Sequence, residues 1–277
     1  MQMLHLRLIY RPKALRHFVR VLILGSGGKD SSYAIWWAML RGWDVAGIVT
    51  VQITGSDSMT FQLPTTSIAG LQAASAKIPW LPIPITGNPD SEMGDLKNAL
   101  EGIIQGSSKQ RSEIWSSSEK SEAMWPETWP WPDDLNRLRP REPIDAIVVG
   151  ALRSDYQKTR VERMCQELGV ISYTPIWHND SHQHMVDLIE HGFSIMMTSI
   201  TTDGLGKEWV GKILTDESFR KLSKLADDFR FNVDGEGGEY ETAVLSAPWM
   251  DREIATKFTA HWTGMRGWAD IWSAELI

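Results

Sequence analysis

The sequence predicts an α/β protein in which a doubly wound parallel sheet is followed by a smaller α+β domain. Short apolar runs alternate with helical stretches through the first 178 of the 277 residues. This alternation is typical of a parallel sheet covered by helices on both faces. After Trp177 the pattern changes, and the chain ends in two runs of alternating side chains around a glycine-containing turn, which indicates antiparallel pairing.

The first strand is expected at residues 21–25 because this run is apolar, and a helix at 30–41 because Gly42 is placed to end it. A second apolar strand at 45–51 completes a βαβ unit, which implies parallel strands and a right-handed crossover. The other expected elements of this part are strands at 81–85, 146–151 and 171–176 and helices at 65–77, 91–105 and 154–168.

The smaller domain is expected to begin near residue 179. Asn179 or Asp180 caps a helix that runs to His191. The remaining expected elements are a strand at 193–200, a mainly helical stretch at 209–229 and two strands around a turn at 264–267. The predicted organisation is therefore a basic extension at 1–20, a first domain at 21–178 and a second domain at 179–277.

Residues 106–141 interrupt the first domain with a serine-rich run and then a run rich in tryptophan and proline. Proline at this density prevents a long helix or a central strand, so we expect an irregular surface insertion. Four of the 14 tryptophans fall here. We expect them to pack the insertion onto the domain; the alternative is an exposed aromatic patch that docks a partner.

Charge and composition exclude several classes of function. The first 20 residues carry five basic and no acidic side chains, whereas the rest carries 23 basic against 35 acidic groups. An acidic body disfavours binding to the phosphate backbone of nucleic acids. No apolar run approaches the length of a membrane helix. The single cysteine, Cys165, fits a reducing compartment such as the cytoplasm. The basic extension is interpreted as an extra helix, a misassigned start or a mitochondrial presequence.

The loop after the first strand carries the clearest chemical motif, Ser26-Gly27-Gly28-Lys29-Asp30-Ser31. It lies between a strand and a helix, where backbone amides and the helix dipole favour an anion. It is neither a Walker A loop nor a dinucleotide fingerprint, because Asp30 occupies a position that each of those motifs reserves for another residue type. The motif resembles the SGGxDS pyrophosphate loop of the N-type ATP pyrophosphatases. The alternative is a plain glycine-rich turn.

A second motif, GALRSDYQKTRVERMCQELG at 150–169, follows the fourth strand. Ser154 and Gln157 have the spacing of a capping box, and Gln157 is expected to point toward the carboxyl ends of the strands, where ligands bind. Arg160 is predicted to reach the same crevice, unless it is a solvated helix charge like Arg163. Cys165 belongs to an apolar stripe at helical spacing and is predicted to lie in the core.

A third motif, Asp234-Gly235-Glu236-Gly237-Gly238-Glu239-Tyr240-Glu241-Thr242, holds four carboxylates within eight residues. Concentrated carboxylates repel one another, so a cation or hydrogen-bond donors are expected beside them. The alternative is an acidic hairpin tip. The histidines at 178, 182, 184 and 191 match no closed zinc pattern, and we expect a solvated helix face there.

Together with TPIW at 174–177 and GMRGWADIWSAEL near the end, these motifs resemble the diphthine–ammonia ligase family over roughly residues 20 to 277. The resemblance implies an adenine nucleotide alpha hydrolase-like fold that uses ATP and Mg²⁺. It also implies that the carboxylate of diphthine, a modified histidine of translation elongation factor 2, attacks the α-phosphorus of ATP, and that ammonia then displaces AMP. The basic extension and the insertion depart from the family pattern, but neither touches a motif.

On this reading, ATP and Mg²⁺ are bound by Ser26, Gly27, Gly28, Lys29, Asp30, Ser31, Ser32 and Gly150, with Ser26–Ser32 at the pyrophosphate end and Asp30 as the metal ligand. The substrate would contact Ser154, Tyr156, Gln157, Arg160, Glu236, Gly237, Gly238, Glu239 and Glu241. Catalysis is assigned to Lys29, Asp30, Arg160, Glu236 and Glu239, with Glu236 or Glu239 holding ammonium or the trimethylammonium group of diphthine.

Two other functions stay open. A tRNA-modifying enzyme of the same superfamily would share the loop, but sulfur chemistry of that kind commonly needs paired cysteines. A nucleotide sensor would bind ATP without cleaving it. No nucleic-acid or membrane partner is expected.

Overall fold

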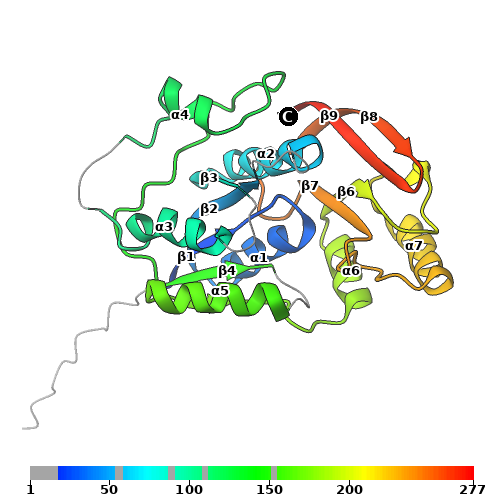
Figure 1. The fold of residues 1–277 in the computed structure, drawn as a ribbon, viewed down its shortest axis with the longest axis horizontal. Coiled ribbons are helices and arrows are strands. Elements are labelled where there is room, and N and C mark those ends of the chain that lie inside the picture. Colours follow the sequence, from blue (N-terminus) through cyan, green and yellow to red (C-terminus); the bar gives the residue numbers. More distant parts are fainter. Residues whose placement is uncertain (1–17, 54–58, 87–90, 108–111, 151–154) are drawn as a thin grey trace, which may run out of the picture.

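The computed structural model describes residues 18–53, 59–86, 91–107, 112–150 and 155–277, with only the backbone described at 59–65 and at Gln157. Two sheets organise this part of the chain (Figure 1). The first is a parallel sheet in the order β3-β2-β1-β4-β5, and the second is an antiparallel sheet in the order β7-β6-β9-β8. The predicted fold class, a doubly wound α/β sheet with a smaller α+β part, is confirmed.

The elements of the first sheet follow the predicted alternation with shifted ends. They are β1 (Arg20–Leu24), α1 (Lys29–Leu40), β2 (Asp44–Ile53), α2 (Met59–Ser75), β3 (Trp80–Ile85), α3 (Glu92–Ile104), α4 (Ser117–Glu122), β4 (Ala146–Val149), α5 (Asp155–Leu168) and β5 (Ile171–Tyr173). Those of the second sheet are α6 (Ser181–Glu190), β6 (Ser194–Ile200), η1 (Lys207–Trp209), α7 (Asp216–Phe229), β7 (Tyr240–Ser246), β8 (Ile254–Thr263) and β9 (Arg266–Leu276).

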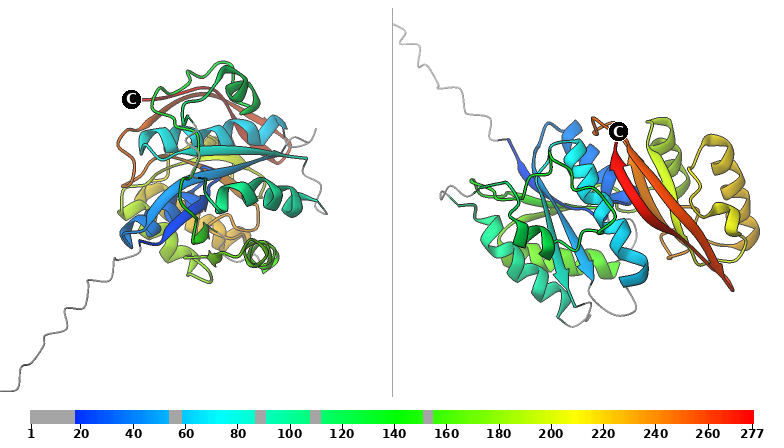
Figure 2. Two further views of the ribbon diagram at one scale, coloured as in Figure 1. Left: turned by 90° about the vertical axis from the view of Figure 1, so that its left-hand side faces the viewer. Right: turned by 90° about the horizontal axis from the view of Figure 1, so that it is seen from above.

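Helices cover both faces of the first sheet, as Figure 2 shows. Successive strand residues point to opposite faces. In β1, Val21 and Ile23 accordingly join the buried cluster that includes α1, whereas Leu22 joins the cluster formed with α3 and α5. A strand with both faces buried must be apolar throughout, which is why β1 reads as a continuous apolar run.

The outer edge of β3 is closed by proline. Trp80 pairs with the returning insertion, because its N–H donates to the carbonyl of Asn136 (2.8 Å) and its carbonyl accepts from Leu138 (3.0 Å). Backbone groups alternate in direction along a strand, so Pro82 and Pro84 face the same edge as Trp80. Proline has no N–H to donate, and this edge therefore cannot pair with a further strand.

The insertion is more ordered than we predicted from its composition. Ser116 and Glu119 form a capping box that starts the short helix α4 within the serine-rich run. Trp115 and Trp129 are buried, and the indole N–H of Trp129 donates to the carbonyl of Ile271 in β9 (3.3 Å). The prediction that tryptophans pack the insertion onto the body of the protein is confirmed for these two residues.

The prediction of a mainly helical stretch at 209–229 is wrong for residues 210–214, which are not helical. Residues 210–214 instead run beside β6, where Leu214 N–H donates to the carbonyl of Ile195 (2.8 Å). Gly211 adopts a φ of 77° and contacts Phe258 so closely that a Cβ would lie 2.0 Å from the ring. Helix α7 begins only after Thr215, which caps it. Strand β7, which contains the end of the acidic motif, was not predicted.

The two sheets share one apolar interior. The largest cluster of buried residues contains Val21 and Ile48 of the first sheet together with Ile195 and Val244 of the second. Among the described residues, no helix is both long enough and apolar enough to span a membrane.

Candidate active site

A cleft opens where the strand order of the first sheet reverses. Strands β1 and β4 are neighbours there, and their following connections leave in opposite directions, which is the usual ligand position in such sheets. Gly150, directly after β4, approaches the start of α1 so closely that a Cβ would lie 2.5 Å from the carbonyl carbon of Asp30. Only glycine fits at this contact, which brings two of the predicted motifs together.

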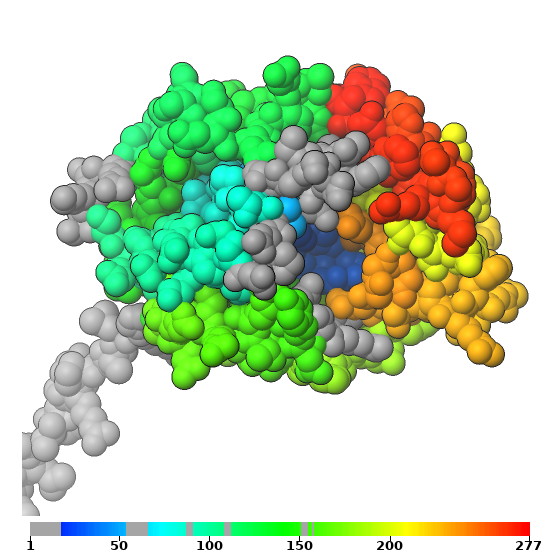
Figure 3. Space-filling view, viewed as in Figure 1, coloured from blue at the N-terminus to red at the C-terminus, as the bar shows by residue number. Residues whose placement is uncertain are grey.

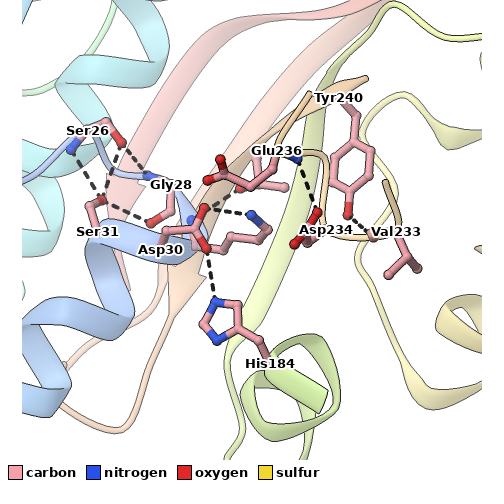
Figure 4. A network of polar contacts seen from close by, with 11 residues as sticks. Ser26, Gly28, Asp30, Ser31, His184, Val233, Asp234, Glu236 and Tyr240 are labelled. Atoms are coloured by element: carbon pink, nitrogen blue, oxygen red, sulfur yellow. Dashed lines mark hydrogen bonds and ion pairs between the residues drawn. The ribbon is translucent and has the colours of Figure 1, made fainter. Parts of the chain in front are cut away.

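The loop after β1 presents backbone amides at the start of α1. Gly27 has a φ of 87°, a conformation that glycine adopts without strain, and Gly28 precedes the helix without a side-chain cap. The N–H of Gly28 donates to Ser26 Oγ (3.4 Å), and the N–H of Ser26 donates to Ser31 Oγ (3.2 Å). Figure 4 shows this network. The amides of Ser26 and Gly28 thus donate to hydroxyl oxygens within the loop. Phosphate oxygens are also hydrogen-bond acceptors, so amides at such a helix start are suited to bind them.

Strand β7 of the second sheet packs directly against this loop. The backbone N–H of Lys29 donates to Thr242 Oγ1 (3.2 Å), and Val244 N–H donates to the carbonyl of Gly27 (2.9 Å). Gln72 of α2 hydrogen-bonds to both sides of this contact. Its Nε2 donates to the carbonyl of Gly27 in the loop (3.0 Å) and to the carbonyl of Val244 in β7 (2.7 Å). The conformation of the loop therefore depends on residues from two distant parts of the chain, α2 and β7.

Lys29, Asp30 and His184 form a charged group at the floor of the cleft. Lys29 Nζ lies 2.6 Å from Asp30 Oδ2, and His184 Nε2 lies 3.0 Å from Asp30 Oδ1. Lys29 and His184 are buried, at 5% and 2% exposure. Burial by itself would raise the pKa of Asp30, but the charge of Lys29 and the hydrogen bond from His184 outweigh it and lower that pKa.

The position of His184 corrects one of our predictions. We expected the histidines of this region on a solvated helix face, and His182 is indeed exposed. His184 instead lies on the buried face of α6 with Met185 and Leu188. This spacing is that of an apolar stripe, so the periodicity of the helix contained the signal.

The cleft has a volume of about 700 Å³ and gathers most of the predicted site residues. Figure 3 shows it as a hollow whose blue floor lies between the teal surface of α3 and the orange surface of the second sheet. The predicted residues that line it are Ser26, Gly28, Lys29, Asp30, Ser31, Gly150, Tyr156, Arg160, Glu236, Gly238 and Glu241. Residues not predicted also line it, including Thr66, Glu92, Tyr240 and Thr242.

Other predicted residues lie away from this lining. Ser32 is fully buried, and its Oγ accepts from the indole N–H of Trp249 (3.1 Å). Glu239 Oε1 accepts from the N–H of Asn232 (2.9 Å) and from its Nδ2 (2.8 Å), so this carboxylate holds the turn together. Gly27 and Gly237 shape their turns and are not part of the lining. Ser154 and the side chain of Gln157 lie outside the described residues.

The wall opposite the loop comes from α5. Arg160 donates to the hydroxyl of Tyr156 (2.8 Å), and its guanidinium lies 4.8 Å from the centre of that ring. It also forms an ion pair with Glu92 of α3 (3.5 Å). Tyr156 is 63% exposed, so its ring presents an aromatic surface to the cleft.

The remaining wall is the acidic turn before β7. Glu241 has an exposed side chain, but the walls of the cleft reduce its hydration, and this desolvation raises its pKa. Tyr240 is buried, and its pKa is raised well above the usual value of 10.0 by burial and then by the charges of Asp234, Asp30 and Glu239. Within the described part of the chain, no three His, Cys, Asp or Glu side chains converge as a metal-binding group.

Family models match nearly all of this architecture. One described as the diphthamide synthase N-terminal domain matches residues 19–122 and 131–172, and one described as the diphthamide synthase C-terminal domain matches residues 180–277. The chain belongs to the diphthamide synthase family. The unmatched residues 123–130 fall in the tryptophan-rich insertion.

Curated relatives in this family are named diphthine–ammonia ligase. The Schizosaccharomyces pombe protein is 28% identical over 245 residues, which are 85% of this chain and 36% of the relative. The Homo sapiens protein is 26% identical over 85% of this chain and 82% of its own length. The Danio rerio protein is 25% identical over 88% of this chain and 89% of its own length. The chain thus spans about a third of the S. pombe relative and most of the other two.

A solved structure described as a predicted subunit of a tRNA methyltransferase from Methanocaldococcus jannaschii aligns with a TM-score of 0.37 at 12% identity. The alignment covers 83% of this chain and all of that chain.

Proposed function

We propose that this family member amidates a carboxylate at the expense of ATP through an acyl-adenylate, converting diphthine on translation elongation factor 2 to diphthamide with ammonia. The observation that supports it most is the juxtaposition of the loop after β1 with the acidic turn before β7 in one cleft. The loop offers amides and Lys29 to an anion, whereas the turn offers carboxylates to a cation, so a triphosphate and an amine can bind side by side.

The first step joins two anions, and the protein must hold them together. A carboxylate oxygen attacks the α-phosphorus, a new P–O bond forms, and the bond from the α-phosphorus to the departing pyrophosphate breaks. The loop amides and Lys29 would bind the pyrophosphate end, and Arg160 would stabilise charge from the opposite wall. Positioning and charge stabilisation of this kind supply most of the acceleration in such reactions.

In the second step, ammonia attacks the acyl carbon. A C–N bond forms, the C–O bond to AMP breaks, and the proton lost from nitrogen passes to solvent. Glu236 or Glu239 would hold ammonium or the trimethylammonium group of diphthine. Since Glu239 also binds Asn232, the exchange Glu239→Gln tests this role best when amidation and ATP binding are measured separately: amidation should slow more than ATP binding weakens, and equal losses would count against it.

The carboxylates of the cleft fit Mg²⁺. Magnesium in nucleotide sites is usually bound by one or two carboxylates together with phosphate oxygens and water. Asp30 lies at the floor beside the loop and Glu236 and Glu241 line the same cleft, so oxygen ligands are available there. When bound, Mg²⁺ neutralises charge on the phosphates. Asp30 would be its ligand from the loop.

We further propose that residues 21–178 are an ATP-binding domain and 179–277 a substrate-binding domain, and that the protein acts in the cytoplasm. The domain division is supported by the two sheets, and the location by a substrate that belongs to the translation machinery.

One assay tests the proposal. Purified protein is incubated with ATP, Mg²⁺ and ammonium, with and without elongation factor 2 that carries diphthine, and AMP and pyrophosphate are measured. AMP formation that requires both the factor and ammonium is expected. A nucleotide sensor would release no pyrophosphate under any of these conditions, and a tRNA-modifying enzyme would respond to tRNA rather than to the factor.

A further inference from the structure

Asp234 is a buried carboxylate that the predicted site did not include. It is 1% exposed, and its Oδ1 accepts from the N–H of Glu236 at 3.3 Å. Its Oδ2 is also buried and has no hydrogen-bond partner among the described residues. A buried charged oxygen without a donor is unfavourable for folding. A charged group is retained in such a place when something else compensates it.

Two residues of the same turn, Asn232 and Tyr240, direct their donors to acceptors other than Asp234. Asn232 gives both its N–H and its Nδ2 to Glu239 Oε1, and the hydroxyl of Tyr240 donates to the carbonyl of Val233 (2.5 Å). Like Asp234 Oδ2, Glu239 Oε2 is buried and has no hydrogen-bond partner within the described residues. The turn therefore contains two buried carboxylate oxygens that its own groups do not satisfy.

Three carboxylates lie close enough to Tyr240 for their charges to affect its pKa. Asp234, Asp30 and Glu239 all raise the pKa of Tyr240, after the effect of burial. The nearby cation of the cleft floor, Lys29, directs its Nζ to Asp30 at 2.6 Å. In Figure 4 the second oxygen of Asp234 is directed away from the N–H of Glu236. A small cation that carries several N–H donors would satisfy the unpaired oxygens and the local charge together.

We infer that Asp234, assisted by Glu239, binds the ammonium ion that supplies the amide nitrogen. This inference rests on the proposed function and names the binding site of its nitrogen substrate. The bound ammonium loses a proton to solvent, and the resulting ammonia attacks the acyl carbon. Ammonium is small and has four N–H donors to offer a buried carboxylate, whereas a trimethylammonium group has no N–H and is much larger. Exposed carboxylates such as Glu241 are better suited to that larger group.

The exchange Asp234→Asn tests the site with little change in shape. The Oδ1 acceptor for Glu236 is kept, whereas the charge and the acceptor at Oδ2 are replaced by an amide donor. Pyrophosphate release is first measured with diphthine-bearing factor, ATP and Mg²⁺ but without ammonium. Amide formation is then measured against ammonium concentration. We expect unchanged pyrophosphate release and a KM for ammonium that is higher by about tenfold or more. The control Asp251→Asn removes an exposed carboxylate and should match the wild type.

The possible outcomes separate the two proposals. A wild-type protein that releases no pyrophosphate contradicts the proposed function. Normal pyrophosphate release with equal KM values for ammonium in the wild type and in Asp234→Asn overturns the inference about Asp234 alone.

A binding measurement on the wild type does not depend on the variant folding. Melting temperatures are compared in ammonium, sodium, potassium and tetramethylammonium chloride at one ionic strength. The inference requires a higher melting temperature in ammonium chloride than in the other three salts. Equal stabilisation by potassium or by tetramethylammonium would overturn it, as would stabilisation by magnesium chloride that removes the response to ammonium.

Discussion

His184 and Asp30 join the two sheets at the floor of the cleft. The imidazole Nε2 of His184, on α6, lies 3.0 Å from Oδ1 of Asp30, in the first turn of α1, although 154 residues separate them in sequence. The other carboxylate oxygen of Asp30 is bound by Lys29. The histidine thus fixes the rotamer of the carboxylate that we propose as the metal ligand.

Replacing His184 should therefore affect both stability and chemistry. The exchange His184→Ala leaves a largely buried carboxylate oxygen without its donor, and we expect a loss of about 1–3 kcal/mol in the free energy of unfolding. Pyrophosphate release should also slow. Urea denaturation and a pyrophosphate assay measure the two effects. His182→Ala, on the exposed face of the same helix, is the control and should change stability by no more than about 0.5 kcal/mol.

The contact between Gly150 and α1 leaves no room for a methyl group. In Gly150→Ala the new Cβ would lie 2.5 Å from backbone atoms of Asp30, so either β4 or the loop must move. Overpacking of this kind costs about 1–3 kcal/mol, and ATP binding should weaken because the loop is displaced. Gly102→Ala in α3 meets nothing within 4 Å and should instead stabilise the protein by up to about 1 kcal/mol. Equal melting temperatures of the two variants would contradict this account.

Thr242 should matter through its hydroxyl group. The exchange Thr242→Val keeps the shape but leaves the backbone N–H of Lys29 without its acceptor, at a cost of about 1–3 kcal/mol. Because that amide belongs to the loop that we propose binds pyrophosphate, we expect the KM for ATP to rise by about tenfold. Thr242→Ser keeps the acceptor and should restore a KM close to that of the wild type. Steady-state kinetics of AMP formation distinguish the two variants, and a Ser variant as impaired as Val would disprove the role of the hydroxyl.

The insertion should contribute to stability through Trp129. This side chain is 4% exposed and is hydrogen-bonded to β9, so Trp129→Ala should lower the free energy of unfolding by about 3–5 kcal/mol. Trp272, on β9, is 47% exposed, and Trp272→Ala should cost about 1 kcal/mol or less. Chemical denaturation of both variants checks the difference. Similar losses would show that the insertion is not packed as described.

The burial of Cys165 should make the stability of the folded protein depend on pH in the alkaline range. Desolvation raises the pKa of its thiol from 9.0 to about 11. Between these values the unfolded chain loses the proton while the folded protein keeps it, so this group stabilises the fold below pH 9 and its contribution falls as the pH rises toward 11. The decrease is at most about 1.4 kcal/mol per pH unit. Other groups titrate here too, so the difference between wild type and Cys165→Ala is measured; a difference that does not vary with pH would refute the assignment.

The fold class and the first motif could be predicted because their signals are local. The apolar run of β1, the glycines that follow it and the helix that begins at Lys29 lie within 21 residues. Their periodicity and turn chemistry act over a few residues, as does the apolar stripe that placed Cys165 in the core. The alternation of strands and helices then limits the topology, since parallel strands need right-handed crossovers.

The sequence alone thus determined the glycine-rich loop that we propose binds the pyrophosphate end of a nucleotide, and the sheet that carries it. It did not determine that His184 contacts Asp30, that Thr242 accepts from Lys29 across 213 residues, or that one oxygen of Asp234 lacks a donor among the described residues. Those properties were decided by the tertiary structure. A polar side chain is placed by the groups that surround it, and here those groups come from the other sheet, so no spacing along the chain specifies the contact.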